Sequence, residues 1–213
     1  MKLHGYFRSS AAYRCRIAFN LKGVTPESTS VHLRKGEQRS AAFLKLNPNG
    51  LVPALEEGGR VLTQSLAIIE WLDETHPSPP LLPKDPFDRA HVRALAFSIA
   101  CDIHPLQNLR VLAYLRTELD QDQAGLDKWC RRWIESGLAA YEATLVATAA
   151  AGRFSFGDAP TIADICLVPQ VFSAGRFGAD ISKLATIKRI MANAEAHPAF
   201  AAAHPSKQPD FEP

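Results

Sequence analysis

A proline-rich stretch divides this chain into two dissimilar parts. Residues 76–86, HPSPPLLPKDP, hold five prolines in eleven positions. Proline lacks a backbone N–H and has a fixed φ, so such a stretch can form neither a central strand nor the interior of a helix. We therefore expect a semi-rigid linker at residues 76–86 between a domain at residues 1–80 and a domain at residues 86–213.

The part before the linker alternates between strand-like and helix-like patterns. It predicts the order β-α-β-α-β-β-α, which describes a small α/β domain with a mixed sheet. Pro53 stands at the head of a predicted strand, and a cis Val52–Pro53 peptide bond would explain its position, because cis bonds are almost confined to proline. The strands are expected at residues 3–7, 28–33, 51–55 and 61–63. The helices are expected in the part of residues 8–22 that follows Ser10, at residues 41–46 and at residues 66–75.

The part after the linker contains no convincing strand and is predicted to be all-helical. A long helical pattern is interrupted at Pro105, where a helix is expected to kink. Thr161 and Asp164 form a capping box before a strongly apolar helix. The helical patterns cover residues 87–118, 127–150, 165–177 and 183–203.

Composition narrows the classes of function. The net charge is +2 and no long Lys/Arg run occurs, so nucleic acid is not an expected partner. No apolar stretch is long enough to span a bilayer, and the N-terminus lacks the apolar region of a signal peptide. The four cysteines are widely spread and form no CxxC pair, which argues against a metal site or a disulfide framework. We therefore expect a cytoplasmic protein with no metal and no membrane partner.

Two hydroxyls, Ser9 and Ser10, lie between the first predicted strand and the first predicted helix. Backbone N–H groups at a helix start lack intrahelical acceptors, and the helix dipole favours negative charge there. A thiolate or a carboxylate could be held at this point. Helix capping alone is the commoner role of a serine at a helix start and remains the alternative.

A set of motifs along nearly the whole chain occurs in an order typical of one family. Together the motifs resemble those of the zeta class of glutathione transferases, which includes maleylacetoacetate isomerase and to which the bacterial maleylpyruvate isomerases look closely related. One position departs from the family pattern: the cysteine that follows the two serines is Ala11 here. The motifs are Arg8-Ser9-Ser10 with Arg14-Cys15-Arg16-Ile17-Ala18, Asn47-Pro48 with Val52-Pro53-Ala54-Leu55, Gln64-Ser65 through Glu70, His104 through Leu109, Leu167 through Val171, Arg176-Phe177, and His204-Pro205 with Gln208-Pro209-Asp210.

The resemblance implies the glutathione transferase fold, with a thioredoxin-like N-terminal domain and a C-terminal helical domain. It also implies a homodimer with reduced glutathione as cofactor. Ser9, and then Ser10, would hydrogen-bond the glutathione sulfur, with Ala11 beside them. The other implied glutathione contacts are the backbone of Val52 before Pro53, Gln64 and Ser65 on the γ-glutamyl carboxylate, Gln38 as a weaker candidate at the glycyl end, and Asp102 reaching the γ-glutamyl ammonium across a dimer interface.

Cationic side chains are expected to bind a dicarboxylate substrate, because an arginine fork can bind both oxygens of a carboxylate. The resemblance favours Arg8 and Arg176, and less firmly Arg110; a surface salt bridge is the commoner role of each one singly. Helical spacing would place His104 and Asn108 on one face with Arg110 beside it. His104 could relay a proton near neutral pH, and a structural histidine is the alternative.

The implied activity is a glutathione-dependent cis–trans isomerisation of maleylacetoacetate to fumarylacetoacetate in aromatic amino-acid breakdown, with glutathione regenerated. Conversion of maleylpyruvate to fumarylpyruvate in gentisate breakdown is one alternative. A zeta-class transferase that conjugates glutathione to halogenated acids is another. A binding module without thiolate activation is a third, and the two serines argue against it.

Overall fold

The computed structural model describes residues 1–212, which form two compact units. The N-terminal unit contains residues 1–80 together with the segment from Glu195 onward, and the helical unit contains residues 81–194. The division falls within the proline-rich stretch. The segment after residue 194 was expected to belong to the helical domain, but it packs instead on the N-terminal unit, because its short helix α9 (Pro198–Ala203) lies against α1 (Ser10–Leu21).

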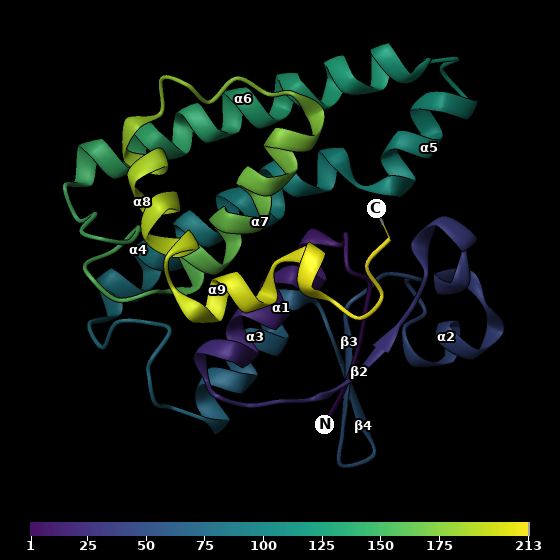
Figure 1. The fold of residues 1–213 in the computed structure, drawn as a ribbon, viewed down its shortest axis with the longest axis horizontal. Coiled ribbons are helices and arrows are strands. Elements are labelled where there is room, and N and C mark those ends of the chain that lie inside the picture. Colours follow the sequence, from purple (N-terminus) through teal and green to yellow (C-terminus); the bar gives the residue numbers. More distant parts are fainter. Residues whose placement is uncertain (213) are drawn as a thin grey trace. The chain divides into compact units, whose positions relative to one another are not determined.

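The N-terminal unit has the predicted order of strands and helices (Figure 1). Two short 3-10 turns occupy the region where a strand end and a loop were expected, and the strand there is confined to Glu27–Ser30. The elements are β1 (Lys2–Gly5), α1, β2 (Glu27–Ser30), 3-10 turns at Leu33–Lys35 and Glu37–Arg39, α2 (Ala41–Leu46), β3 (Ala54–Glu57), β4 (Arg60–Thr63) and α3 (Ser65–Thr75).

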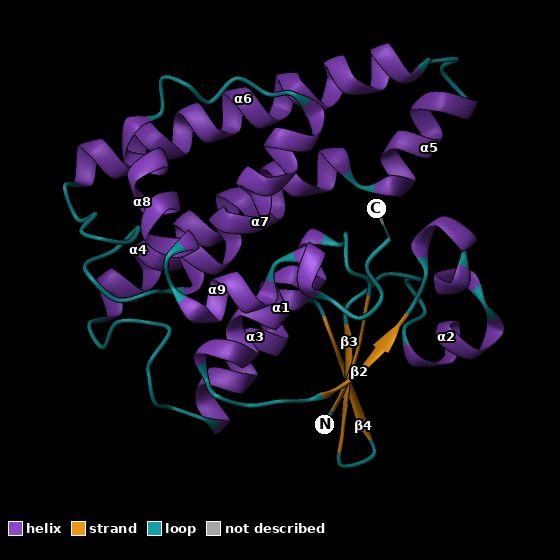
Figure 2. Ribbon diagram, viewed as in Figure 1, coloured by secondary structure: helices purple, strands orange, loops and turns teal. Residues whose placement is uncertain are grey.

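The sheet of this unit is mixed, as predicted. Its strand order is β2-β1-β3-β4, with β1 parallel to β2 and antiparallel to β3, and with β3 antiparallel to β4. Helices α1 and α3 cover one face and α2 lies on the other (Figure 2). Ile17 of α1 and Ile68 of α3 are fully buried, so the helices on that face are held to the sheet by apolar packing. The Val52–Pro53 peptide bond is cis, in agreement with the expectation from the sequence.

The helical unit is built around α7, in which almost every residue of the first three turns is buried. Helices α4 and α6 pack against it. Its elements are α4 (Pro86–Phe97), a π-helical segment (Ser98–Ile103), a 3-10 turn (His104–Gln107), α5 (Leu109–Thr117), α6 (Gln123–Thr148), α7 (Ile162–Phe177) and α8 (Ala185–Glu195), which ends at the first residue of the C-terminal segment.

The expected long helix at residues 87–118 is broken more strongly than a proline kink requires. The chain leaves α-helical geometry at Ser98 and becomes extended at Asn108, whose φ and ψ are −68° and 144°. His104 and Asn108 therefore do not share a helical face, and that prediction was wrong. Gly137 of α6 allows the close approach of this segment, because a Cβ there would lie 2.4 Å from the side chain of Ile103.

Among residues 1–212, no helix is both long enough and apolar enough to cross a membrane. The same residues contain no group of three or more His, Cys, Asp or Glu side chains placed to hold a metal ion.

Candidate active site

Ser9 caps the first turn of α1. Its backbone is extended (φ −70°, ψ 117°), and its hydroxyl oxygen accepts a hydrogen bond of 3.2 Å from the backbone N–H of Ala12. A hydroxyl that accepts one hydrogen bond can still donate its own proton to a ligand. Ser9 is half-buried and Ser10 is 9% exposed. Because the first turn of α1 contains no acidic residue, the positive end of this helix dipole is not neutralised there.

The turn that presents Ser9 is held from both sides. The backbone N–H of Ser9 donates to the carbonyl oxygen of Tyr6 at 3.0 Å. The guanidinium of Arg16 donates to the carbonyl oxygens of Tyr6 (3.4 Å) and Phe7 (3.0 Å), as well as to that of Ala203 (3.0 Å). Burial lowers the pKa of Arg16 to about 10, so the group is still a cation at neutral pH. Arg8 is half-buried within this turn.

A second polar cluster lies at the start of α3. Ser65 is the first helical residue and is buried, whereas Gln64 before it is exposed and has a positive φ of 70°. The guanidinium of Arg14, which is only 2% exposed, donates to the Ser65 hydroxyl at 3.4 Å. Its other two nitrogens have no hydrogen-bond partner among the described residues. A buried cation beneath a helix N-terminus favours an anion at that point.

Val52 and Gln38 complete the predicted glutathione residues of this unit. Val52 is buried immediately before the cis bond that leads into β3. Gln38 lies in the second 3-10 turn, half-buried, and its amide oxygen has no hydrogen-bond partner within residues 1–212. The N-terminal unit thus contains every residue predicted for glutathione except Asp102, and it also contains Arg8. The glutathione residues in this unit are Ser9, Ser10, Ala11, Gln38, Val52, Pro53, Gln64 and Ser65.

The remaining predicted residues belong to the helical unit. Asp102 is exposed in the π-helical segment, and His104 is half-buried at the start of the 3-10 turn. Asn108 caps α5 by accepting a hydrogen bond of 3.1 Å from the backbone N–H of Arg110, which is exposed. Arg176 is exposed in the last turn of α7, and its guanidinium lies over the neighbouring phenylalanine ring.

Buried amides fix the segment that carries His104 and Asn108. Gln107 donates to the side-chain oxygen of Gln170 at 2.9 Å and accepts from the hydroxyl of Ser173 at 2.6 Å, both on α7. The indole of Trp129 on α6 donates to the carbonyl oxygen of Leu106 at 2.7 Å. The segment is therefore anchored to α6 and α7 of its own unit directly after Pro105.

Sequence reasoning missed Arg14 and Gln107 as contributors to these two clusters. Arg14 had one signal: a charged residue among the apolar positions of an amphipathic helix, next to Tyr13. No local sign in the sequence indicated the role of Gln107 beyond its place in the motif from His104 to Leu109, because its partners on α7 lie more than sixty residues away.

The residues present suit glutathione. A hydroxyl donor at an open helix start suits a thiolate, and Ser65 above Arg14 suits a carboxylate. Tyr13, which follows the two serines in α1, adds no negative charge near this site, because burial raises the pKa of its phenol to about 12.

Comparison with known proteins supports the same assignment. Residues 8–75 match the family model described as the glutathione S-transferase N-terminal domain. The chain is 50% identical to the maleylpyruvate isomerase of Ralstonia sp, with 99% of both chains covered, and 49% identical to the probable maleylacetoacetate isomerase of Vibrio cholerae, covering 98% of this chain and 97% of the relative.

Two solved structures resemble this protein over its full length. One is a holo maleyl pyruvate isomerase described as a bacterial zeta-class glutathione transferase, with a TM-score of 0.97, 50% identity and complete coverage of both chains. The other is a maleylacetoacetate isomerase from Methylobacterium extorquens AM1 with bound malonate and glutathione, with a TM-score of 0.97, 42% identity and complete coverage. These findings confirm the predicted fold class. The chain belongs to the zeta class of glutathione transferases, and has the thioredoxin-like N-terminal domain and helical C-terminal domain of that fold.

Proposed function

We propose that this protein is a glutathione-dependent cis–trans isomerase that converts maleylacetoacetate to fumarylacetoacetate and regenerates glutathione in each turnover. The observation that carries the proposal is the full-length similarity to isomerases of maleyl keto acids, including relatives named maleylacetoacetate isomerase in Pseudomonas aeruginosa and in mouse, at 46% and 44% identity. The open, hydroxyl-capped start of α1 supports it independently.

Glutathione, when bound, supplies a thiol whose thiolate adds reversibly to the cis double bond, so that this bond becomes single, rotates and reforms as trans. Ser9 donates its hydroxyl proton to the sulfur, and Ser10 adds a backbone N–H from the first turn of α1. Both favour the charged form of a thiol whose ordinary pKa is about 8.5. Ala11 leaves the space beside the sulfur without a competing thiol.

The glutathione peptide is held through its ends and its backbone. Gln64 and Ser65 bind the γ-glutamyl carboxylate, and the buried Arg14 beneath Ser65 adds positive charge. Val52 offers its backbone to the cysteinyl residue. Gln38 reaches the glycyl end. In a homodimer, Asp102 of the partner subunit would bind the γ-glutamyl ammonium.

The substrate carboxylates are bound by Arg8, Arg110 and Arg176, because guanidinium forks match carboxylate geometry. Negative charge grows on the conjugated oxygen of the substrate during addition, and these cations stabilise it. Asn108 is fixed as the cap of α5 and presents Arg110 in the first turn of that helix. His104 relays a proton to or from the enolic oxygen.

Maleylpyruvate is the second candidate substrate. It is favoured by the relative of 50% identity and by the holo structure with a TM-score of 0.97, both of which are named for that substrate. The two substrates differ only in the length of the keto-acid arm, a difference of methylene scale that is worth about 1–3 kcal/mol in a binding site.

A spectrophotometric assay on both substrates, with and without glutathione, tests the proposal. We expect conversion that requires glutathione and leaves its concentration unchanged, and the ratio of the two kcat/KM values identifies the preferred substrate. Failure to convert either substrate while glutathione still binds would contradict the isomerase, and consumption of glutathione with halogenated acids would then identify a conjugating transferase.

A further inference from the structure

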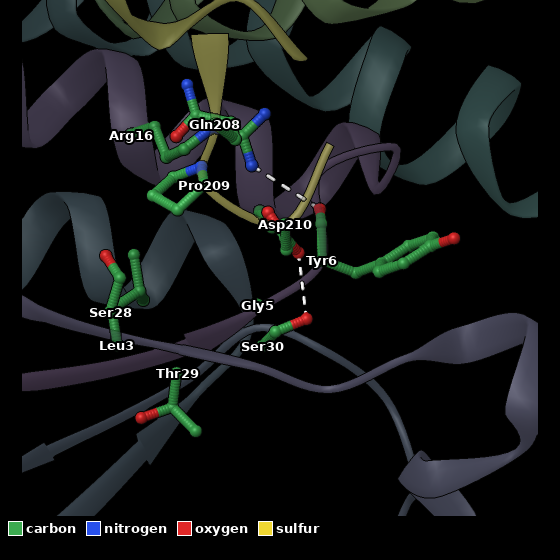
Figure 3. Close-up of a pocket in the computed structure, with 11 residues that line it drawn as sticks. Leu3, Gly5, Tyr6, Arg16, Ser28, Thr29, Ser30, Gln208, Pro209 and Asp210 are labelled. Atoms are coloured by element: carbon green, nitrogen blue, oxygen red, sulfur yellow. Dashed lines mark hydrogen bonds between the residues drawn. The ribbon is translucent and has the colours of Figure 1, made fainter. Parts of the chain in front are cut away.

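The Gln208-Pro209-Asp210 motif near the C-terminus has no part in the reaction proposed above. In the structure it crosses the end of the sheet beside a cavity of about 240 Å³ lined by residues of β1, α1, β2 and the C-terminal segment itself. Figure 3 shows the Asp210 side chain between Tyr6 and Ser30. The motif therefore lies against the chain segment that enters the Ser9 turn.

Asp210 makes two hydrogen bonds with one carboxylate oxygen. Its Oδ2 atom accepts from the backbone N–H of Phe7 at 3.0 Å and from the hydroxyl of Ser30 at 2.9 Å. Phe7 is two residues before Ser9 in a turn closed by the Ser9–Tyr6 hydrogen bond. A charged acceptor makes a stronger hydrogen bond than a neutral one. Asp210 thus ties the Ser9 turn to strand β2.

Arg16 holds the carbonyl side of the same turn. Its guanidinium binds the carbonyl oxygens of Tyr6 and Phe7, and it also binds Ala203, which precedes the motif in the C-terminal segment. The backbone N–H and C=O of Phe7 are therefore both bonded to charged side chains from elsewhere in the chain. Without them, the Phe7 peptide would be held only by the hydrogen bonds of its neighbours in the turn, such as that from the Ser9 N–H to the Tyr6 carbonyl oxygen.

We propose that Asp210 is a positioning residue for the thiolate site, because it fixes the Phe7 peptide and thereby aims the Ser9 hydroxyl at the glutathione sulfur. The proposal rests on the proposed function for the identity of the ligand. It gives a role to the Gln208-Pro209-Asp210 motif, which takes no part in the proposed reaction or in the capping of α1. A hydroxyl displaced by a fraction of an ångström donates poorly, so loss of Asp210 acts on the sulfur. It leaves the anchors at Gln64 and Ser65 in place, because the hydrogen bonds of Asp210 are to Phe7 and Ser30.

The same C-terminal segment offers a matched control. The carboxylate of Glu212 accepts hydrogen bonds from His32 at 3.0 Å and from Arg34 at 2.5 Å. These contacts tie the segment to the loop after β2. His32 packs against the ring of Tyr6, with the ring centroids 5.1 Å apart, but neither contact is a hydrogen bond to Phe7 or Ser9. Glu212→Ala therefore removes a tie of the segment and keeps the hydrogen bond to the Phe7 N–H, whereas Asp210→Ala removes that hydrogen bond.

The experiment measures the thiol pKa of bound glutathione from thiolate absorbance, with kcat and the glutathione KM, in Asp210→Ala, Asp210→Asn, Glu212→Ala and the parent protein. For Asp210→Ala we expect the thiol pKa to rise by about one unit, because a tenfold loss of thiolate stabilisation corresponds to one pKa unit. We expect kcat at neutral pH to fall about tenfold and KM to change less than twofold, which a misplaced side chain at the reacting centre would produce. Asp210→Asn keeps an acceptor oxygen and should restore most of the effect, and Glu212→Ala should match the parent protein.

Equal losses in Asp210→Ala and Glu212→Ala would overturn the proposal, because the segment would then act only by stabilising the fold. An unchanged thiol pKa in folded Asp210→Ala would overturn it as well. If Asp210→Ala does not fold, Ser30→Ala, which removes the second hydrogen bond of Asp210, must raise the thiol pKa measurably or the proposal fails. The thiol pKa requires no maleyl substrate, so failure of the isomerase assay with thiolate formation intact would count against the proposed function alone.

Discussion

Helices α1 and α7 both begin with a hydroxyl cap, yet the two ends differ in their electrostatics. At α7, the hydroxyl of Thr161 accepts from the backbone N–H of Ala163 at 3.3 Å. Asp164, which is 0% exposed, accepts from the Thr161 N–H (2.8 Å), the Thr161 hydroxyl (3.0 Å) and the Ser155 N–H (2.7 Å). At α1, Ser9 accepts from a backbone N–H in the same way, but no carboxylate lies in the first turn.

The difference separates a closed helix end from an open one. Asp164 accepts from the N–H of the N-cap residue Thr161 and from that of Ser155, and it places a carboxylate at the positive end of the dipole, so no ligand is needed there. The start of α1 lacks that charge and remains half-exposed, so a thiolate can supply it. A capping hydroxyl therefore indicates a ligand site only where the chain itself leaves the helix end uncompensated.

The largest effect on stability should come from removing the carboxylate that closes the start of α7. Asp164→Ala removes the acceptor of three buried hydrogen bonds, and we expect the free energy of unfolding to fall by about 3 kcal/mol, because buried N–H groups are then unsatisfied. Urea denaturation measures the loss. Asp164→Asn keeps one acceptor oxygen and should cost less. A loss below about 1 kcal/mol would show that the closed end contributes no more than an ordinary cap.

Removing the hydroxyl at the open end should affect activity rather than stability. For Ser9→Ala we expect about a hundredfold lower kcat, at the lower end of the cost of removing one donor to a charged reacting atom, and about 1 kcal/mol lower stability. Ser40, whose hydroxyl caps α2 by accepting from the Phe43 N–H at 3.2 Å, is the matched control. Ser40→Ala should lose similar stability and keep full activity. Equal turnover in the two variants would make Ser9 a cap and nothing more.

The sequence predicts the starts of both helices. It predicts only some of the contacts that make the two starts different. The Thr161–Asp164 spacing predicts its own hydrogen bonds, because a capping box is local. The predicted order of the N-terminal elements also follows from local periodicity and turn residues. Such patterns carry no information about Asp210, which bonds the N–H of Phe7 across most of the chain.

The same limit applies to the helical unit. Periodicity predicted helices on both sides of Pro105 but not the π-helical segment, which depends on Gly137 admitting Ile103. Residues beyond 194 were assigned to the helical domain because they are helical and follow it in sequence. Their true partners, among them α1, are determined by tertiary packing that no local signal records.

An acidic residue at the open end should make α1 resemble α7. Ala11→Asp places a carboxylate in the first turn, and we expect stability to rise by about 0.5 kcal/mol through the helix dipole. The same charge repels the glutathione thiolate, so we expect kcat/KM to fall about tenfold, equivalent to a thiol pKa about one unit higher. Ala11→Asn, similar in shape but neutral, is the control. Stability and activity that change in the same direction would contradict the comparison.

Ala11→Cys should have the smallest effect on turnover. It is also the most direct test of the electrostatic potential at the N-terminus of α1. This change restores the family residue, and we expect isomerase turnover to stay within about twofold, because the thiol of glutathione, not that of the protein, performs the chemistry. The new thiol lies at an uncompensated helix start, which lowers a cysteine pKa and speeds alkylation at neutral pH. Cys101 is exposed and provides the reference rate, while Cys15, Cys130 and Cys166 are buried, and burial raises the pKa of Cys130 to about 11. Peptide mapping after iodoacetamide labelling should therefore find residue 11 modified faster than Cys101. Equal rates would mean that the start of α1 stabilises a thiolate no better than open solvent does. The starts of α1 and α7 would then differ in their hydrogen bonds but not in their electrostatics.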